Sequence, residues 1–425
     1  MENTSTIVDN RGKNMKTTRP DQTCVPQFLN GADQKKTVPA IRIMFINSAA
    51  NIFGAERCLL TILDHLDHSR FHPVVLLPHS GSLQEELEKR GVKTILYDYK
   101  FRPLKNSLRR FWDLTRFMTQ LIRNERISIV HINLHYYASN FWLAFFLTKV
   151  TVVSHVRSPL WFHPFEKFVM SRHHKILFVS KAVRQKFVQK RRSDALIRFR
   201  PEQLEVLYDG HDLQKFQLPK RDILRKEFKL DPQDRIICLI GAIDSVKGQD
   251  VLIEAAGIVN RTYPNARYFI IGSQYKHSPE KQAYALRLRI MVDELGLKGK
   301  VFFTGYRDDV PEILPEIDIL VQPSSHEALG GSMLEAMCAA KPVIGFQIDA
   351  AMEVIGEEEA GIVLKERTGK SLAQALIFLL ENPKEARHRG LAGQSRARRF
   401  FDIKNSNERL MQIYTQAVSK RSERP

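Results

Sequence analysis

The stretch "RIICLIGAIDSVKGQDVLIEAA", residues 235–256, contains an apolar run, a loop that begins at Gly241 and a helical pattern that begins near Gly248. A short run that is apolar on both sides of the chain is typical of a strand buried on both faces, as in parallel sheets. Because a helical pattern follows directly, the stretch predicts one β-α unit of an α/β fold. Lys247 lies in the loop between them, where open α/β sheets bind their ligands.

The same alternation continues in both directions along the chain. Further apolar runs are ARYFIIGS, KVFFTGY, DILVQPS and KPVIGF after this unit, and IRIMFIN, HPVVLLP, VKTILYDY, ISIVHIN, TVVSHV and KILFVS before it. A chain of 425 residues also exceeds what one hydrophobic core usually serves. We therefore predict two α/β units with parallel sheets, joined near 204–216, with a ligand cleft between them.

Composition limits the class of protein. The four cysteines form no CxxC pair, so neither a zinc site nor a disulfide framework is indicated, and a reducing cytoplasm fits. The longest apolar run, 141–147, is too short to span a bilayer, which takes about 20 residues. The polar residues 1–38 predict a disordered basic and polar leader.

The formal charge of +18 indicates an acidic partner. Residues 100–126 carry eight basic and two acidic side chains, and residues 181–200 carry eight and one. Neither stretch contains an RNA- or DNA-binding motif, so we expect no nucleic-acid partner. An anionic membrane surface is the alternative, with Phe101, Trp161 and Phe162 as exposed apolar neighbours of the basic residues.

The stretch "SSHEALGGSMLEAMCAAKPVIG", residues 324–345, holds two glutamates on either side of a predicted helix start. One interpretation is a capping box, in which Ser332 and Glu335 satisfy backbone N–H groups of the first helical turn. The other is a ligand site, in which the N–H groups of Gly330, Gly331 and Ser332 receive a phosphate. The carboxylates of Glu327 and Glu335 would then receive hydroxyl groups of the molecule that carries the phosphate.

Gly54, in the loop "NSAANIFGAERCLL" after the first strand, begins another predicted helix. A glycine there permits close approach of the backbone to an anion, and a structural turn explains it equally well. The loop is not a GxGxxG fingerprint, so it gives little support to a dinucleotide site.

From Gly241 to Leu364 the chain resembles the retaining glycosyltransferases of family 4, which are also called glycosyltransferase group 1. The resemblance rests on "GAIDSVKGQDVLIEAA", on Glu327 and Glu335 separated by seven residues within matching flanks, and on "GIVL" at 361–364. The first half matches more loosely, through "GAE" at 54–56, "SHVRSP" at 154–159, "FVSKAV" at 178–183 and "YDGHDLQKF" at 208–216. It implies the GT-B fold, an α/β fold of two Rossmann-like parallel-sheet domains that face a central cleft.

The resemblance also implies roles for individual residues. Glu335 would bind the ribose hydroxyls of a nucleotide sugar, and Glu327 would bind the donor sugar beside its anomeric carbon. Backbone N–H groups of Gly330, Gly331 and Ser332 would hold the distal phosphate, while Lys247 would neutralise the leaving diphosphate. The further site residues would be the main-chain groups of Tyr306 and Arg307 at the nucleobase, His155 at the donor sugar, and Gly54 near the donor.

On this basis the predicted function is metal-independent glycosyl transfer with retention, from a nucleotide sugar to a glycan or lipid-linked acceptor. The nucleotide sugar is a co-substrate, and neither a cofactor nor a metal is expected. The predicted parts are the leader at 1–38, an acceptor-binding domain at 39–208, a nucleotide-sugar-binding domain at 209–396, and a C-terminal helix at 397–425 that could cross back. The expected location is the cytoplasm, with the inner membrane face as a peripheral option.

Departures from the family pattern leave alternatives open. Ala242 stands where the family usually has an arginine that partners the lysine, and "DAAMEVI" at 349–355 lacks the usual Gly-Gly-x-Pro-Glu. The alternatives are an epimerase-like or phosphorylase-like enzyme on the same fold, or a catalytically silent protein that binds sugar nucleotides or membranes. No pyridoxal lysine context supports a phosphorylase.

Overall fold

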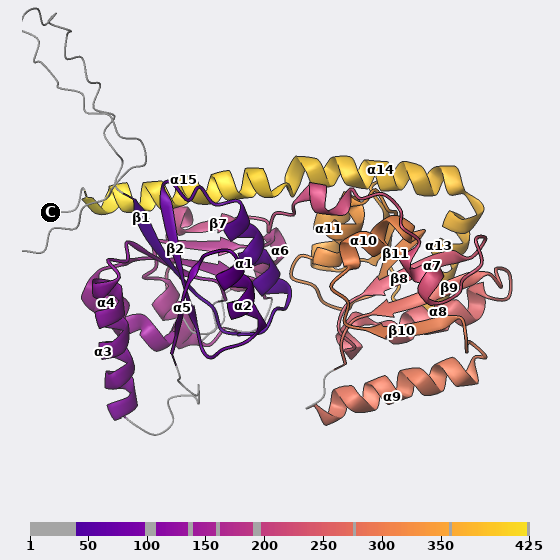
Figure 1. The fold of residues 1–425 in the computed structure, drawn as a ribbon, viewed down its shortest axis with the longest axis horizontal. Coiled ribbons are helices and arrows are strands. Elements are labelled where there is room, and N and C mark those ends of the chain that lie inside the picture. The colour runs from indigo at the N-terminus through magenta and orange to yellow at the C-terminus, as the bar shows by residue number, and fades with distance from the viewer. Residues whose placement is uncertain are drawn as a thin grey trace, which may run out of the picture. The chain divides into compact units, whose positions relative to one another are not determined.

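The computed structural model describes residues 40–97, 108–134, 139–158, 162–189, 197–274, 278–356 and 359–422 (Figure 1). The predicted leader at 1–38 lies outside these residues. So do Phe101, Trp161 and the basic residues at 190–192.

A seven-stranded parallel sheet forms the first half, in the order β3-β2-β1-β4-β5-β6-β7. Its strands are β1 Ile41–Ile46, β2 Phe71–Leu77, β3 Lys93–Leu96, β4 Ile129–Ile132, β5 Thr151–Val156, β6 Lys175–Phe178 and β7 Leu204–Val206. The central strand β1 pairs with β2 and with β4, so that Ile43 lies beside Pro73 and Ile129. β4 and β5 are buried along their whole length, as the apolar runs predicted.

Helices cover both faces of this sheet. They are α1 Gly54–Asp64, α2 Ser82–Lys89, α3 Leu108–Asn124, α4 Trp142–Thr148, α5 Pro164–Met170 and α6 Lys181–Val188. Alternate residues of one strand enter different cores. Val153 of β5 packs with the core that contains α1, whereas Val152 packs with the core that contains α3 and α4. This alternation decides which face of the sheet each strand side chain reaches.

Phe162 differs from its predicted exposure. Its side chain is buried, and its ring centroid lies 4.8 Å from that of Phe187 on α6, in an edge-to-face contact. The apolar ring therefore belongs to the core under α6. The prediction of an exposed Phe162 was wrong because the packing of α6 against this segment could not be deduced from local sequence.

A six-stranded parallel sheet forms the second half, in the order β10-β9-β8-β11-β12-β13. Its strands are β8 Arg235–Ile240, β9 Ala266–Ile271, β10 Val301–Gly305, β11 Ile319–Gln322, β12 Val343–Phe346 and β13 Ile362–Leu364. Its helices are α7 Ile223–Glu227, α8 Gln249–Val259, α9 Pro279–Glu294, α10 Val310–Ile313, α11 Gly331–Cys338, α12 Asp349–Ile355 and α13 Gly369–Glu381. The predicted fold class, two Rossmann-like parallel-sheet units, is confirmed.

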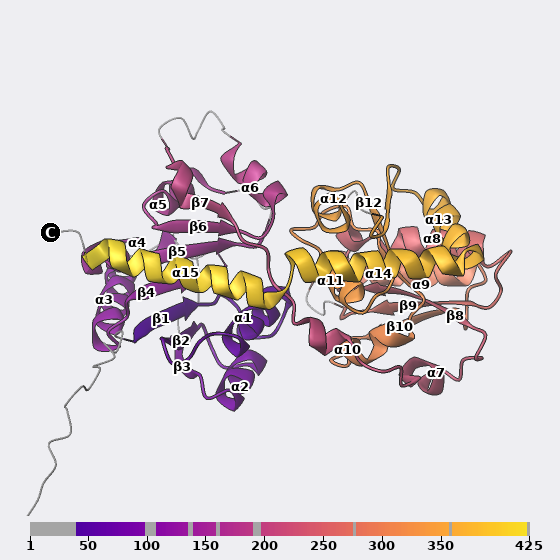
Figure 2. The ribbon, with the colours of Figure 1, turned by 90° about the horizontal axis from the view of Figure 1, so that it is seen from above.

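Two long helices, α14 Pro383–Phe400 and α15 Ile403–Ser422, follow the second sheet. Figures 1 and 2 show α14 beside the second sheet and α15 beside the first. The hydroxyl oxygen of Tyr414 on α15 lies within hydrogen-bond distance of His131 Nδ1 on β4, at 2.6 Å. The side-chain amide of Asn407 donates to the Ile62 carbonyl at 2.8 Å. The last described helix thus completes the core of the first sheet. Among the described helices, none combines the length and hydropathy that a membrane span requires.

Candidate functional site

The loops after β8 and β11 come together because these two strands are neighbours in the sheet. Ile237 of β8 pairs with Ile319 of β11, so both strands end at the same edge. Backbone contact then joins the loops, since Ser325 N donates to the Val246 carbonyl at 2.8 Å. This edge holds most of the site residues predicted for the second half.

Lys247 and Glu327 form a direct ion pair. The Nζ atom of Lys247 lies 2.6 Å from Glu327 Oε1, and the carboxylate side chain is only 11% exposed. Ser324 and Gln322 also donate to Oε1, at 2.8 and 2.9 Å. Two residues that sequence motifs placed 80 positions apart therefore share one polar cluster.

Gly248 makes this approach of the two loops possible. It has φ +73°, and a Cβ atom at this position would lie 2.3 Å from the Pro323 carbonyl oxygen. Asp244 supports the same turn, because its side chain accepts from Val246 N at 3.1 Å. Lys247 is thus presented at the end of a 3-10 turn, Ser245–Lys247, directly in front of α8.

Helix α11 begins without a side-chain cap. Its N-cap is Gly330, which has φ +93°, and the Ser332 hydroxyl donates to Gln322 Oε1 at 2.6 Å. The interpretation of Ser332 and Glu335 as a capping box was therefore wrong. From the described residues, the N–H groups of Gly331 and Ser332 receive no acceptor. The helix thus presents partial positive charge at its N-terminus.

Glu335 lies on the same helix in different surroundings. Burial raises the pKa of its carboxyl group to about 7, although the positive charge of Arg57 acts in the opposite direction. Within the described chain, its carboxylate makes neither a hydrogen bond nor an ion pair. Glu335 is therefore a carboxyl group that is partly buried and not neutralised by a close cation.

Tyr306 and Arg307 follow β10 at the next part of this edge. The Arg307 guanidinium is occupied by Asp309, at 2.7 Å, and by Glu227, also at 2.7 Å. These carboxylates raise its pKa. The Tyr306 side chain is exposed, and its hydroxyl accepts from Arg57 at 2.9 Å. The prediction that main-chain groups of these residues meet a nucleobase stays a prediction.

Gly54 is the first residue of α1, as predicted, and no atom of the described residues lies within 4 Å of the place where a Cβ would be. Close packing by the described residues therefore does not require a glycine there. Glu56 folds back to accept from Phe53 N at 3.1 Å, and this contact satisfies one N–H group at the helix start. A role for Gly54 near the donor stays a prediction.

His155 makes no hydrogen bond or ion pair with the polar cluster around Glu327 among the described residues. It lies within β5 and is 1% exposed, and its Nε2 is 3.9 Å from Asp209, beyond hydrogen-bond distance. Burial and the nearby charge of Arg157 lower its pKa to about 3, so the ring is neutral at pH 7. In this conformation the ring packs beside His131, at 5.8 Å between ring centroids. Its predicted contact with the donor sugar stays a prediction.

A buried polar network at the carboxyl edge of the first sheet was not predicted. Arg157 donates through Nε and Nη2 to Asp209 at 2.9 to 3.0 Å, and through Nη1 to the Asn133 carbonyl at 2.8 Å. Asn133 donates in turn to Asn47 at 2.7 Å. Burial disfavours the Asp209 carboxylate, yet the charge of Arg157 holds its pKa below the usual value. Polar residues directly after strands were the available sequence signal.

Glu353 was also missed, in the segment noted for departing from the family pattern. Its carboxylate accepts from Lys181 N and from the Tyr208 hydroxyl, both at 2.7 Å. It therefore satisfies a free N–H group at the start of α6. Ser180, the residue before α6, donates to the Ala328 carbonyl at 2.7 Å, next to Glu327. The loop after β6 thus contacts the second half at two points.

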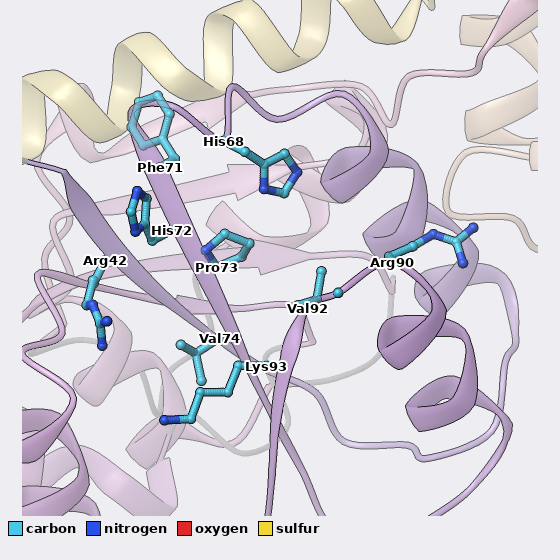
Figure 3. A pocket seen from close by; sticks show the side chains of 10 residues that line it. Arg42, His68, Phe71, His72, Pro73, Val74, Arg90, Val92 and Lys93 are labelled. Carbon is cyan, nitrogen blue, oxygen red and sulfur yellow. The ribbon is translucent and has the colours of Figure 1, made fainter. Parts of the chain in front are cut away.

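A separate basic pocket lies at the opposite, amino-terminal end of the first sheet (Figure 3). It has a volume of about 310 Å³ and is lined by residues that include Arg42, Arg90 and Lys93. These cations have partners, since Arg42 and Lys93 share Glu125 at 3.3 and 2.8 Å, and Arg90 pairs with Asp64 at 2.7 Å. The pocket is therefore not part of the site around Glu327.

Comparison with known proteins identifies the fold first. The chain is similar to the crystal structure of the Anabaena protein HepE in complex with UDP and glucose, with a TM-score of 0.76 and 22% identity. That match covers 88% of this chain and 99% of the HepE chain. The two Rossmann-like domains, each with a parallel sheet, form the GT-B fold of glycosyltransferases.

Sequence comparison then identifies the family. Residues 52–215 match the family described as "Glycosyltransferase Family 4", and residues 220–396 match "Glycosyl transferases group 1". Together the two matches show that the chain belongs to the glycosyltransferases of family 4, also called group 1.

Curated relatives match part of their own length. They include a D-inositol 3-phosphate glycosyltransferase of Segniliparus rotundus, at 26% identity over 47% of this chain and 44% of the relative. A lipopolysaccharide core biosynthesis mannosyltransferase of Rhizobium meliloti matches at 23% identity over 49% of this chain and 60% of the relative. The matched region thus spans about half the length of these relatives.

Proposed function

We propose that the protein transfers a sugar from a nucleotide-sugar donor to a glycan or lipid-linked acceptor, with retention of anomeric configuration and without a metal ion. The observation that carries the proposal is the cluster of Lys247, Glu327 and the open N-terminus of α11. The names of the relatives, glycosyltransferase and mannosyltransferase, support the same class of reaction.

The cluster fits a diphosphate that leaves with negative charge. The N–H groups of Gly331 and Ser332 favour a phosphate at the start of α11. Lys247 adds a full positive charge beside it, and such prearranged groups are often the largest contribution to catalysis. Because Ala242 replaces the usual arginine, Lys247 carries more of the diphosphate charge in this proposal.

The two glutamates divide the remaining contacts of the donor. Glu327 presents its carboxylate next to Lys247, so it would accept hydroxyl hydrogens of the donor sugar near the anomeric carbon. Glu335, one turn inside α11, would accept the ribose hydroxyls. In this arrangement sugar, diphosphate and ribose lie in chain order along one loop and helix.

Neither an epimerase-like enzyme nor a catalytically silent protein is favoured by an observation of its own. An epimerase would convert a nucleotide sugar without an acceptor, so incubation with the nucleotide sugar alone distinguishes it. Thermal shift with UDP-glucose, UDP-N-acetylglucosamine and GDP-mannose would identify the donor class. Anomeric NMR of the product would test retention, and turnover with a chelator would test metal independence.

Glu327→Ala should lower turnover at least tenfold, because the donor sugar loses its anchor beside the reaction centre. Far-ultraviolet circular dichroism and the thermal midpoint check that the fold is intact. Glu312→Ala, which changes a carboxylate of α10 outside the cluster, is the matched control and should keep wild-type turnover. Full activity of Glu327→Ala would contradict the proposed mechanism.

Lys247→Ala should weaken binding of UDP at least tenfold in calorimetry. A charge-assisted contact contributes about 1.5 to 3 kcal/mol, and this lysine stands without the usual arginine partner. Lys298→Ala removes an exposed lysine elsewhere in the second half and should leave the affinity unchanged. An unchanged affinity in Lys247→Ala would show that another group holds the diphosphate.

The proposed partner on the acceptor side is an anionic membrane surface, which the protein contacts reversibly. The relevant face, called the α3–α5 surface here, combines exposed apolar and basic side chains: Leu108, Arg109, Arg110, Trp112, Arg116, Phe146, Phe165 and Phe168. Ring contacts of 6.4 Å join Phe111 to Trp142 and Trp142 to Phe165, so the three helices share one aromatic layer. Aromatic rings with nearby arginines suit the headgroup region of a bilayer.

A further inference from the structure

Gln322, the last residue of β11, is the amide at the centre of the polar cluster. Its side chain is 1% exposed and makes three hydrogen bonds. Its Nε2 donates to Ser324 Oγ at 2.6 Å and to Glu327 Oε1 at 2.9 Å, and its Oε1 accepts from Ser332 Oγ at 2.6 Å. One side chain thus connects the carboxylate of Glu327 to the first turn of α11.

The network fixes which way the amide points. If the amide were turned over, its oxygen would face the negatively charged oxygen of Glu327. The two amide hydrogens would then be aimed at Ser332, and the contact with Glu327 would change from a hydrogen bond to a repulsion. A buried polar group without a partner is destabilising, so only the observed orientation satisfies the group.

The hydrogen bonds divide the two oxygens of Glu327 unequally. Lys247, Ser324 and Gln322 all donate to Oε1, at 2.6, 2.8 and 2.9 Å. Within the described residues no group donates to Oε2. The carboxylate is therefore anchored through one oxygen and presents the other.

We infer that Gln322 is a positioning residue, which holds Glu327 with Oε2 presented to the donor sugar and links that carboxylate to the phosphate-binding start of α11. This inference rests on the proposed function and assigns a role that the family motif does not contain. The same contact directs the Ser332 hydroxyl toward Gln322, and the backbone N–H of Ser332 remains for a phosphate.

The role matters most when the donor is bound. Lys247 is the charged donor to Glu327 in this structure, and a diphosphate would compete for the same ammonium group. As Lys247 turns to the diphosphate, Ser324 and Gln322 keep their hydrogen bonds to Oε1. The two neutral donors thus hold the carboxylate in place while the cation changes partner.

The test compares Gln322→Leu with Gln203→Leu. Gln203 is a matched control, because it is also 1% exposed and makes three hydrogen bonds, but in the first half and away from the site. We expect Gln322→Leu to lower kcat at least tenfold with the donor that wild type uses, while the Kd for UDP changes less than threefold. Gln203→Leu should lower the thermal midpoint and leave kcat unchanged.

A crystal structure of ligand-free Gln322→Leu gives a second measurement that needs no donor. The Glu327 carboxylate should leave its observed position, and Ser332 should lose its partner. A Glu327 carboxylate that stays in place, or a kcat equal to that of wild type, would overturn the inference. If wild type binds and converts none of the nucleotide sugars, the proposed function fails, whereas the crystal structure still decides the role of Gln322.

Gln322→Glu, which keeps the shape of the side chain, covers the case in which the leucine variant does not fold. The introduced carboxyl group can donate to Glu327 only when it is protonated. The activity of this variant relative to wild type should therefore rise as the pH is lowered. A ratio near one at every pH would overturn the inference, because it would show that donation from position 322 is not needed.

Discussion

Glu327 and Glu335 carry the same side chain, yet the fold gives them opposite electrostatic surroundings. Glu327 receives three donors on one oxygen, including the ammonium group of Lys247. Glu335 receives none from the described residues, and burial raises its pKa to about 7. One carboxylate is surrounded by hydrogen-bond donors, and the other exchanges a proton near neutral pH.

Glu335→Gln should therefore change how stability depends on pH. A folded-state pKa above the unfolded value means that the folded protein binds the proton more tightly, so this contribution is present below about pH 4.5 and is lost as the pH rises through 7. Glutamine does not titrate, so the variant does not lose this contribution to stability as the pH rises. Its free energy of unfolding, measured with urea, should exceed that of wild type at pH 8, with a difference that shrinks toward pH 4.5. A difference independent of pH would contradict the raised pKa.

The site residues were predictable as types and motifs, but their contacts were not. Glu327 and Lys247 stand in recognisable motifs, whereas their 2.6 Å ion pair depends on β8 and β11 being neighbours in the sheet. Gln322 was missed because one polar residue at the end of an apolar run looks like the end of a strand. The burial of His155 follows from its place within β5, which is buried on both faces like other strands of the parallel sheet.

At the scale of the element, the start of α11 depends on two adjacent glycines for different reasons. Gly330 has φ +93°, and a Cβ there would lie 2.3 Å from Met333 Cε. Gly331 has ordinary backbone geometry, and its nearest neighbour would be His211 Nε2 at 3.8 Å, an ordinary contact. The fold therefore requires a glycine at position 330. At position 331 the fold does not require one, and the space beside Gly331 can hold a ligand.

Gly330→Ala and Gly331→Ala should consequently separate stability from binding. Gly330→Ala should lower the free energy of unfolding by roughly 1 to 2 kcal/mol, the cost of a left-handed conformation for a residue with a Cβ. Gly331→Ala should keep wild-type stability and weaken UDP binding, because its methyl group occupies space at the phosphate position. Chemical denaturation and calorimetry measure the two effects. Equal UDP affinity in Gly331→Ala and wild type would argue against a phosphate at this helix start.

The strands themselves were predictable from sequence, and their order was not. Apolar runs such as 151–156 and 266–271 coincide with β5 and β9, because strands of a parallel sheet are buried on both faces. The position of β1 between β2 and β4 depends on crossover connections, which leave no mark in any one strand. The capping-box prediction for α11 failed because Gly330 is the N-cap, which places Ser332 inside the helix.

At the scale of the whole molecule, the charge of +18 should govern association with membranes. Wild type should co-sediment with vesicles that contain anionic lipid at low salt and be released at high salt, because each basic residue near such a surface contributes about 1 kcal/mol. Changing Arg109, Arg110 and Arg116 of the α3–α5 surface to Ser should reduce the bound fraction severalfold.

The control for this experiment removes the same charge elsewhere. Arg261, Lys298 and Arg387 are exposed residues of the second half, and their change to Ser should leave vesicle binding nearly unchanged. Trp112→Ser adds a test of the apolar part of the surface and should also weaken binding. If wild type does not sediment at low salt, or if both triple variants lose binding equally, the α3–α5 surface is not the contact.

Helix α15 has a consequence for the time at which the first sheet can fold during synthesis. The core of that sheet includes Ile403, Leu410, Ile413 and Tyr414, all of which belong to this last described helix. Roughly 200 residues separate β7 from α15, and a ribosome needs about 10 to 40 s to make them. During that interval one apolar face of the first sheet lacks its cover. A nascent chain that is stalled or cleaved between residues 364 and 403 would therefore be a substrate for chaperones and proteases, although the described strands of both sheets have already been made.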